Sequence, residues 1–261
     1  MRTPAPPYPE GRQILAGKTV VITASAGTGI GFAAAKRCAE EGAEVMLSDI
    51  HEGRLARFAD ELAEEIGRAV PRVLCDVRSN EDVEALVAKA EAEFGRIDVF
   101  VNNAGMGMTK PLVETEDDEW SRLLDINLSG TFRTLRAVLP GMTKRGAGSI
   151  INLSSICAWR AEAGQTAYAA SKAGVLALTR CAALEAAPHG IRINALVPSL
   201  AIHPYLEKVS SAEFLEKMVR ENEILGRAAE TWEIGNAVIF LASDYASYMT
   251  GESLSVSCRH A

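Results

Sequence analysis

Short apolar segments alternate with amphipathic stretches along most of the chain, starting near Gly17. Apolar runs bounded by turn residues predict strands buried on both faces, and apolar residues that repeat every three or four positions predict helices. The predicted strands are Thr19–Ala24, Val45–Asp49, Arg72–Cys75, Asp98–Asn102, Ser149–Leu153, Arg192–Val197 and Leu254–Val256. The predicted helices are Ile30–Glu41, Gly53–Ile66, Asn80–Phe94, Asp117–Thr143, Thr166–Ala187 and Thr231–Ser243. This order predicts a doubly wound α/β fold of Rossmann type, a parallel sheet of about seven strands with helices on both faces, because right-handed crossovers place helices on each side.

Two segments break this alternation. Residues 1–13 contain four prolines and little apolar periodicity, so we expect a mobile N-terminal tail. Residues 14–261 are then a single domain, because a chain of 261 residues is long enough for one substantial core and too short for two comfortable ones. Within this domain, residues 199–223 are polar and irregular before they become helical, and we expect them to form a substrate lid.

Charge and cysteine usage narrow the possible partners. The net charge is −7 and the basic residues are not clustered, which argues against a nucleic-acid surface. We find no apolar run long enough to cross a membrane and no signal-peptide pattern at the N-terminus. The five cysteines are spread along the chain without metal-ligand spacing or a disulfide framework. We therefore expect no metal, no membrane partner and a location in the reducing cytoplasm.

A glycine cluster joins the first predicted strand to the first predicted helix, in the sequence Ser25-Ala26-Gly27-Thr28-Gly29-Ile30-Gly31. Glycines permit a tight turn and let backbone N–H groups approach a pyrophosphate at the helix N-terminus. The second predicted strand ends at Asp49, whose carboxylate can accept both ribose hydroxyls and repels a 2′-phosphate. Each feature alone has an ordinary explanation, a tight turn or a helix cap. Together, with no Arg or Lys among residues 24–31 or immediately after Asp49, they predict NAD rather than NADP.

A second group of candidate residues lies in the middle of the chain. Tyr168 and Lys172 are four residues apart in a predicted helix and therefore share one face. A neighbouring cation lowers the pKa of a phenol from about 10, which makes a tyrosine usable as an acid/base. Ser155 follows a predicted strand at its carboxyl end, where open α/β sheets bind ligands. Alone, the Tyr–Lys pair would more often be a solvated surface pair, and the serine would more often form a turn.

Taken together, these motifs and Asn102-Asn103-Ala104-Gly105 resemble the short-chain dehydrogenase/reductase family, from about Leu15 to Glu252. The resemblance implies hydride transfer between a nicotinamide dinucleotide and a ketone or secondary alcohol. It implies that Ser155 orients the substrate oxygen, that Tyr168 exchanges the proton, and that Lys172 binds the nicotinamide ribose and lowers the tyrosine pKa. Asn127 would position a water that links Lys172 to solvent. Asn127 and its neighbours Ser129 and Gly130 are also poor helix formers, so we expect a local distortion of that helix.

The resemblance also assigns the dinucleotide contacts. They are Ser25, Gly27, Thr28, Gly29, Ile30, Gly31, Asp49, Asp76, Val77, Asn103, Ala104, Gly105, Tyr168, Lys172, Pro198 and Ala201. Among these, Asp76 would contact the adenine amine, and the three residues 103–105 would line the adenosine ribose and brace the central strand.

The chain departs from the family pattern at several positions. Ser25 replaces the first glycine of the cluster, and Pro198-Ser199 replaces the usual Pro-Gly. His203 stands where a threonine commonly meets the nicotinamide carboxamide. The C-terminal residues 255–261 replace a frequent Asp-Gly-Gly of the family. The resemblance implies a homotetramer or homodimer, but it does not predict which contacts this C-terminal segment makes between subunits.

The sequences of several segments resemble those of a bacterial subgroup of the family that acts in steroid catabolism. Among these segments are residues 24–29, 179–181, 185–187 and 257–260. This similarity implies a hydroxy-indane-propanoate substrate, as its coenzyme A thioester. Residues near Ser155 and in the expected lid suit an apolar ring with an anionic tail: Trp159, Arg160, Ile202, Tyr205, Leu206, Lys208 and Phe214. The aromatic members could equally be packing residues. A straight-chain 3-oxoacyl thioester reductase and a catalytically silent dinucleotide-binding module are the alternatives, and four retained catalytic residues argue against the second.

Overall fold

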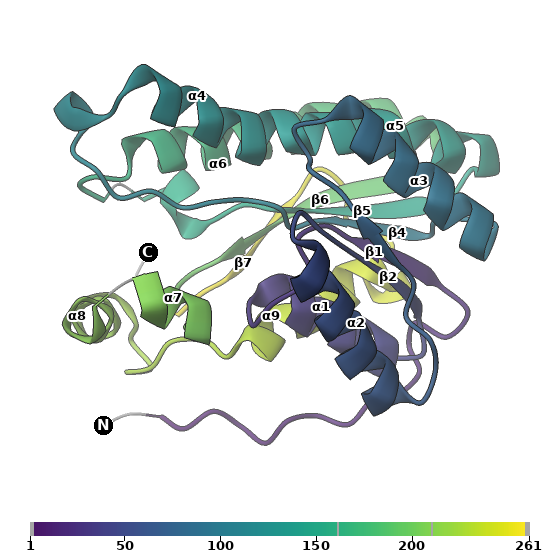
Figure 1. The fold of residues 1–261 in the computed structure, drawn as a ribbon, viewed down its shortest axis with the longest axis horizontal. Coiled ribbons are helices and arrows are strands. Elements are labelled where there is room, and N and C mark those ends of the chain that lie inside the picture. The colour runs from purple at the N-terminus through teal and green to yellow at the C-terminus, as the bar shows by residue number, and fades with distance from the viewer. Residues whose placement is uncertain (1–2, 161, 210, 259–261) are drawn as a thin grey trace.

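The computed structural model describes residues 3–160, 162–209 and 211–258. In these residues seven strands form one parallel sheet in the order β3-β2-β1-β4-β5-β6-β7 (Figure 1). The strands are β1 Thr19–Ile22, β2 Glu44–Asp49, β3 Arg72–Leu74, β4 Val99–Asn102, β5 Gly148–Leu153, β6 Ile191–Pro198 and β7 Ser253–Val256. The predicted doubly wound, seven-stranded fold is confirmed.

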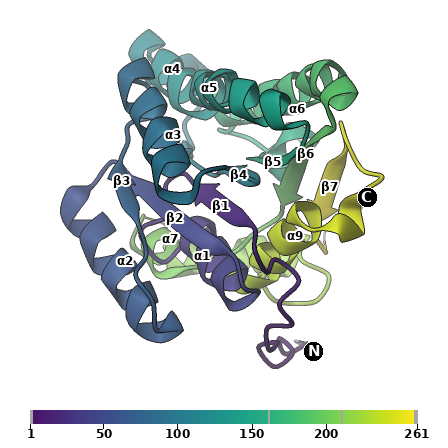
Figure 2. The same cartoon turned by 90° about the vertical axis from the view of Figure 1, so that its right-hand side faces the viewer.

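Helices cover both faces of this sheet (Figures 1 and 2). They are α1 Ile30–Glu40, α2 Glu52–Ile66, α3 Asn80–Phe94, α4 Asp117–Leu124, α5 Gly130–Arg145, α6 Thr166–Ala186, α7 Pro204–Val209, α8 Ala212–Asn222 and α9 Thr231–Ala242. Successive residues of a strand point to opposite faces, so β1 contributes to two cores. Val20 and Ile22 pack with α1, α2 and α9, whereas Val21 packs with α3, α5 and α6.

The longest predicted helix, Asp117–Thr143, is interrupted in the structure. A π-helical turn, Asp125–Ser129, separates α4 from α5. The interruption falls at the poor helix formers around Asn127, so the expected distortion is present. On the other face of this turn, Leu128 packs against α6 at Gly174, where a Cβ would lie 2.8 Å from a Leu128 methyl carbon. Because Gly174 has no side chain, α6 leaves space for Leu128 of the π-helical turn.

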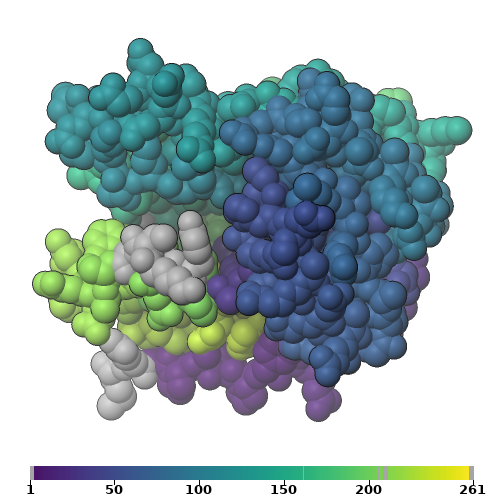
Figure 3. Space-filling view, in the orientation of Figure 1, coloured from purple at the N-terminus to yellow at the C-terminus, as the bar shows by residue number. Residues whose placement is uncertain are grey.

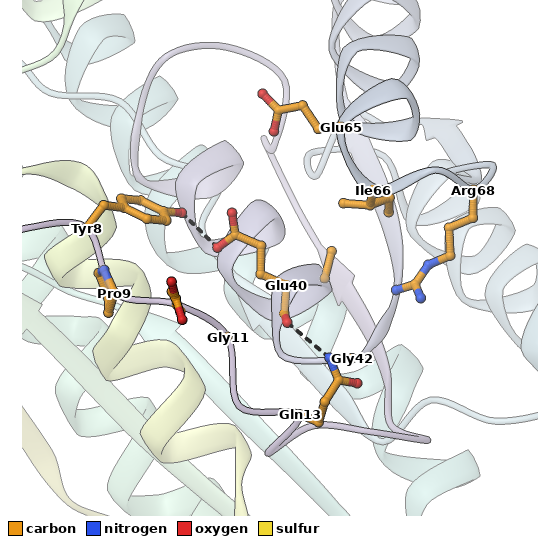
Figure 4. Close-up of a pocket in the computed structure, with 11 residues that line it drawn as sticks. Tyr8, Pro9, Gly11, Gln13, Glu40, Gly42, Glu65, Ile66 and Arg68 are labelled. Carbon is orange, nitrogen blue, oxygen red and sulfur yellow. Dashed lines mark hydrogen bonds between the residues drawn. The ribbon is translucent and has the colours of Figure 1, made fainter.

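The segment before β1 follows the surface without helix or strand until a turn near Ile14. The Tyr8 hydroxyl donates to Glu40 at 2.8 Å, its ring meets the edge of Trp232, and the N–H of Arg12 donates to Glu41 at 2.8 Å. These contacts attach the segment to α1 and α9, and its mobility stays a prediction. A cavity of about 500 Å³ lies between this segment and the ends of α1 and α2 (Figure 4). It is lined by none of the residues expected to bind cofactor or substrate.

Candidate active site

Most of the expected site residues lie at or just after the carboxyl ends of parallel strands, which all lie at the same end of the sheet, and the others lie in the π-helical turn and in α6. The glycine turn lies between β1 and α1, with Gly29 as the N-cap of α1 and Gly27 at a φ of 140° that favours glycine. Thr28 at its tip is exposed. The first backbone N–H groups of α1 therefore open to this edge, as anion binding requires.

Ser25, where the family has a glycine, points into the protein. It is fully buried, its hydroxyl donates to the Ile22 carbonyl at 2.9 Å, and it accepts the Ser48 N–H at 3.0 Å. The turn tolerates this side chain because the hydroxyl joins β1 to β2. Strain is taken up one residue earlier, at Ala24, whose φ is 49°. The structure thus gives the Ser25 hydroxyl a bracing role between β1 and β2, and the expected cofactor contact at this residue stays a prediction.

Asn103 connects this turn to the end of β4. Its amide nitrogen donates to the carbonyls of Thr23 at 3.1 Å and Ala24 at 2.9 Å, and the Thr23 hydroxyl accepts the N–H groups of Asn103 and Ala104. The expected bracing of the central strand is therefore visible. A Cβ on Gly31 would lie 2.4 Å from both the Ala24 oxygen and the Asn103 nitrogen, so only glycine fits there.

The adenosine end carries two acids, each paired with an arginine. Asp49 is almost fully buried at the end of β2, and its carboxylate meets Arg54 at 2.7 Å. Asp76 binds Arg78 through both carboxylate oxygens, and this hydrogen bonding holds the pKa of Asp76 below its ordinary value. Sequence reasoning missed Arg54, because it looked only immediately after Asp49. The signal was present, since the first turn of a helix that follows a strand returns toward the strand end.

Tyr168, Lys172 and Ser155 meet at the ends of β5 and α6. The Lys172 ammonium donates to the Leu153 carbonyl at 2.8 Å and lies 5.9 Å from the centre of the Tyr168 ring. The Tyr168 hydroxyl hydrogen-bonds Ser155. Ser155 also accepts the Cys157 N–H at 3.2 Å, which makes it the N-cap of a short 3₁₀ turn. The serine is therefore a turn former and a partner of the tyrosine at once.

Burial dominates the proton affinities of this group. It raises the pKa of Tyr168 to about 12, against the opposing hydrogen bond from Ser155. Burial lowers the pKa of Lys172 to about 8, because it removes the water that would stabilise the charged ammonium. The expected lowering of the tyrosine pKa by Lys172 is not found in this structure. The Lys172 ammonium donates to the Leu153 carbonyl and lies 5.9 Å from the centre of the Tyr168 ring, and burial, not the charge of Lys172, determines the direction of the tyrosine pKa.

The π-helical turn places Asn127 beside these residues. The side-chain nitrogen of Asn127 donates to the Met106 carbonyl and to the Ser171 hydroxyl, and its oxygen accepts the Met106 N–H at 2.8 Å. A Cβ on Gly105 would lie 3.3 Å from both the Asn127 oxygen and the Lys172 nitrogen. The loop after β4 thus places Gly105 against Asn127 and Lys172, so the residues expected to bind the dinucleotide and those expected to be catalytic lie next to one another.

Beyond β6 the segment expected to be the lid begins beside the glycine turn. Ala201, two residues after Ser199, is buried and forms an isolated bridge with Ala229. The His203 ring lies 3.6 Å from where a Cβ on Gly29 would be, over the glycine turn. Burial lowers the pKa of this imidazole, although Glu207 opposes the effect. His203 therefore neighbours the expected pyrophosphate position.

Helices α7 and α8 lie in the segment expected to be the lid, and α8 begins with the Ser211 hydroxyl accepting the Phe214 N–H at 3.2 Å. Its far end is held by the C-terminal segment, because the Cys258 thiol donates to Glu223 at 2.9 Å and Ser199 donates to the same carboxylate. Figure 3 shows this face of the molecule hollowed between the teal surface near α4 and the green lid.

Trp159 and Phe214 are exposed, so neither is a core residue, and Arg160, Ile202 and Leu206 are half-buried. The Tyr205 and Lys208 side chains lie outside what the structure describes. Within the described residues no group of acidic, histidine or cysteine side chains is suited to hold a metal. No helix among them is long and apolar enough to cross a membrane.

A Rossmann-type sheet with these side chains at the carboxyl ends of its strands is typical of nicotinamide-dependent oxidoreductases, and the comparisons with known proteins show that class. A family model described as enoyl-(acyl carrier protein) reductase matches residues 24–258. A Mycobacterium tuberculosis protein named (5R,7aS)-5-hydroxy-7a-methyl-1-oxo-2,3,5,6,7,7a-hexahydro-1H-indene-carboxyl-CoA reductase is 51% identical over 258 residues, 98% of each chain. The 3-oxoacyl-[acyl-carrier-protein] reductase FabG of Thermotoga maritima is 37% identical over 93% of this chain and 97% of its own. A crystal structure of a short chain dehydrogenase from Mycobacterium smegmatis has a TM-score of 0.88 and 45% identity, with 99% of each chain covered.

The chain therefore belongs to the short-chain dehydrogenase/reductase family. It is an oxidoreductase that acts on the alcohol or ketone group of a small molecule and uses a nicotinamide dinucleotide.

Proposed function

We propose that the protein interconverts a secondary alcohol and a ketone on a bulky alicyclic substrate, a hydroxy-indane acid carried as its coenzyme A thioester, with NAD as the cofactor. The observation that carries this proposal is the 51% identity, over 98% of both chains, to a reductase named for a hydroxy-indene-carboxyl-CoA. Exposed Trp159, four residues after Ser155, and exposed Phe214, in the expected lid, support it, because unpacked aromatic side chains can cover an apolar ring. The half-buried Arg160 is available for an anionic tail.

The proposed reaction uses the three side chains at the ends of β5 and α6. A nicotinamide dinucleotide held by the glycine turn and Lys172 would supply or accept the hydride. In ketone reduction the neutral Tyr168 phenol donates its proton to the substrate oxygen, and in alcohol oxidation the Tyr168 phenolate takes the proton of the substrate hydroxyl. Ser155 orients the substrate oxygen beside the phenol, which its hydrogen bond to Tyr168 supports. Lys172 binds the nicotinamide ribose, and its place against Gly105 suits that role.

The residues of the described edge fit a dinucleotide. Gly27 has open space where a Cβ would be, and α1 presents its N-terminus beside it. A ribose would meet Asp49 at the end of β2, as NAD binding requires. The side-chain nitrogen of Asn127 donates both of its hydrogens, to Met106 and Ser171. Its side-chain oxygen accepts one hydrogen bond, from Met106, so a second lone pair can accept from the water expected next to Lys172.

The proposal is tested by comparing catalytic efficiency with a hydroxy-indane-propanoyl thioester and with a short 3-hydroxyacyl thioester, each with NAD and NADP. We expect the ring substrate to be favoured by about tenfold or more, which needs only about 1.4 kcal/mol of differential transition-state binding. NAD should be the better cofactor. Tyr168→Phe should abolish turnover and leave dinucleotide affinity near normal, with Tyr248→Phe, a fully exposed tyrosine, as the matched control. Equal rates for the two thioesters would remove the ring substrate.

A second candidate is a carrier-protein type 3-oxoacyl thioester reductase, favoured by the 37% identity to FabG of Thermotoga maritima. The lower identity makes it the weaker candidate, and a preference for the linear thioester would select it. We further propose a homotetramer or homodimer in the cytoplasm, without a nucleic-acid partner.

A further inference from the structure

Glu223, the residue that follows α8, is 4% exposed, and both of its carboxylate oxygens accept hydrogen bonds. Its Oε2 accepts the Ser199 hydroxyl at 3.2 Å and the Cys258 thiol at 2.9 Å, and its Oε1 accepts the Leu200 N–H at 3.4 Å. Burying a carboxylate is unfavourable unless hydrogen-bond donors replace the water that it loses. The acid therefore depends on these three donors.

No cation shares this task among the residues that the structure describes, because none of their ion pairs includes Glu223. Arg227, four residues further along the chain, is bound elsewhere. Its two terminal nitrogens donate to the two carboxylate oxygens of Glu233 at 2.7 and 2.8 Å. The contacts of Glu223 are thus directional hydrogen bonds, which fix the position of each donor.

The three donors come from two segments that are distant in sequence. Ser199 and Leu200 begin the loop after β6 and lie between two expected dinucleotide contacts, Pro198 and Ala201. Cys258 lies two residues after β7, the strand that pairs with β6. Because the acid itself stands at the end of α8, its carboxylate joins the start of the expected lid to the lid's end and to the C-terminal segment.

Ser199 and Cys258 both lie where the chain departs from the family pattern. The usual glycine after Pro198 has no side-chain donor, and the Asp-Gly-Gly that the C-terminal segment replaces has no thiol. Both replacements supply a hydrogen to the same oxygen of Glu223. One buried acid therefore accounts for two departures that sequence alone left unexplained.

The loop that Glu223 holds leads directly into the candidate site. The Leu200 carbonyl accepts the Ala229 N–H at 2.9 Å, and the next residue, Ala201, is buried and forms a bridge with Ala229. Two residues further on, the His203 ring lies 3.6 Å from the Cβ position of Gly29 in the glycine turn. A shift at the start of this loop would therefore displace residues that lie over the turn.

We propose that Glu223 is a positioning residue, which holds both ends of the expected lid and the C-terminal segment together and thereby sets how tightly the enzyme binds its alcohol or ketone substrate. This inference rests on the proposed function, in which the lid contributes to the substrate site. When these contacts are lost, ordering the lid opposes substrate binding in the ground state and in the transition state alike. KM then rises while kcat is nearly unchanged.

The test is steady-state kinetics with the hydroxy-indane-propanoyl thioester and NAD. Glu223→Gln keeps the shape of the side chain but leaves one acceptor oxygen instead of two, so at least one contact is lost. We expect KM for the thioester to rise by about tenfold, the range of one hydrogen bond to a charged group, and kcat to change by less than about threefold. Cys258→Ala should raise KM in the same direction, whereas Cys258→Ser, which restores a donor, should lie within about threefold of the wild type.

Two exposed residues provide matched controls. Glu252→Gln makes the same change at an exposed acid next to β7, and Cys181→Ala makes it at an exposed cysteine of α6. Neither should change KM or kcat. Circular dichroism checks folding, and the two Cys258 variants decide the question if Glu223→Gln does not fold. The inference is overturned if KM stays at the wild-type value, if kcat falls as far as KM rises, or if Cys258→Ser behaves like Cys258→Ala.

A wild type that turns over no thioester would contradict the proposed function and leave the role of Glu223 to a measurement without substrate. Trypsin can cut α8 after Lys217 or Arg220 when the lid opens. Because cutting follows the population of the open form, Glu223→Gln should be cut at these sites about tenfold faster than the wild type. Equal rates of cutting would overturn the inference independently of any activity.

Discussion

At the scale of single residues, the catalytic edge holds a phenol and an ammonium whose proton affinities burial moves in opposite directions. The pKa of Tyr168 rises to about 12 and that of Lys172 falls to about 8, so both groups favour their neutral forms. A charged Lys172 at neutral pH is therefore held at a cost to the fold, which the Leu153 carbonyl offsets in part. The role proposed for a charged Lys172 would therefore lower the stability of the fold.

This cost has a pH signature that Lys172→Met should reveal. Below about pH 8 the lysine is charged in both states, whereas from there to its ordinary value of 10.5 the unfolded chain binds more protons than the folded one. The free energy of unfolding therefore rises with pH across this window, by up to about 3 kcal/mol at about 1.4 kcal/mol for each tenfold change in proton affinity. Comparison with the variant cancels the opposite effect of buried Cys38 and Cys75, whose pKa values burial raises to about 12.

The measurement is urea unfolding followed by circular dichroism at about pH 7.5 and about pH 10. We expect the wild type to gain stability relative to Lys172→Met between the two. Lys89→Met, which removes a surface lysine of α3, is the control. A stability difference that is the same at both pH values would contradict the assignment.

At the scale of elements, strands and helices could be predicted because the apolar pattern is set locally. Asn80–Phe94 has the predicted bounds, and the distortion at Asn127 follows from poor helix formers. The fate of individual side chains could not be predicted in this way. Ser25 faces inward and Arg54 returns to Asp49 through contacts between different elements, and the pKa of Tyr168 depends on how much protein surrounds it. Sequence spacing identifies neighbours on one helix face, but it does not give burial.

The start of α1 packs so closely against the loops after β1 and β4 that there is no room for one added carbon atom at Gly31. In Gly31→Ala the new methyl would lie 2.4 Å from the Ala24 carbonyl, which is backbone and cannot rotate away. We expect the free energy of unfolding to fall by about 1–3 kcal/mol, as for overpacked sites, and dinucleotide affinity to fall with it. Gly53→Ala, in the exposed first turn of α2 with nothing within 4 Å, should be neutral or stabilising. Thermal unfolding and dinucleotide titration of both variants measure this, and equal behaviour would show that the turn has room.

At the scale of the whole molecule, β7 is an edge strand of the sheet (Figure 2), with an apolar surface beside it. Tyr248 is 103% exposed, and Tyr245 and Leu184 are also largely exposed. Leu184 follows Ala183, whose Cβ lies 3.5 Å from the Cβ position of Gly251, so the end of α6 and the segment before β7 are adjacent. An edge strand with exposed aromatic side chains is a surface that proteins normally cover.

A second copy of the chain is the occupant that we expect for this surface, because a two-fold axis beside an edge strand lets one patch cover its own copy. Light scattering after gel filtration should give the mass of a dimer or tetramer. The double variant Leu184→Lys/Tyr248→Lys should have the mass of a smaller species. Burying two unpaired charges in the interface is more unfavourable than the apolar contact between the subunits is favourable. Val113→Lys is the matched control, because Val113 is 94% exposed but lies away from β7, before α4. An unchanged mass in the double variant, or a monomeric wild type, would show that β7 is a free edge.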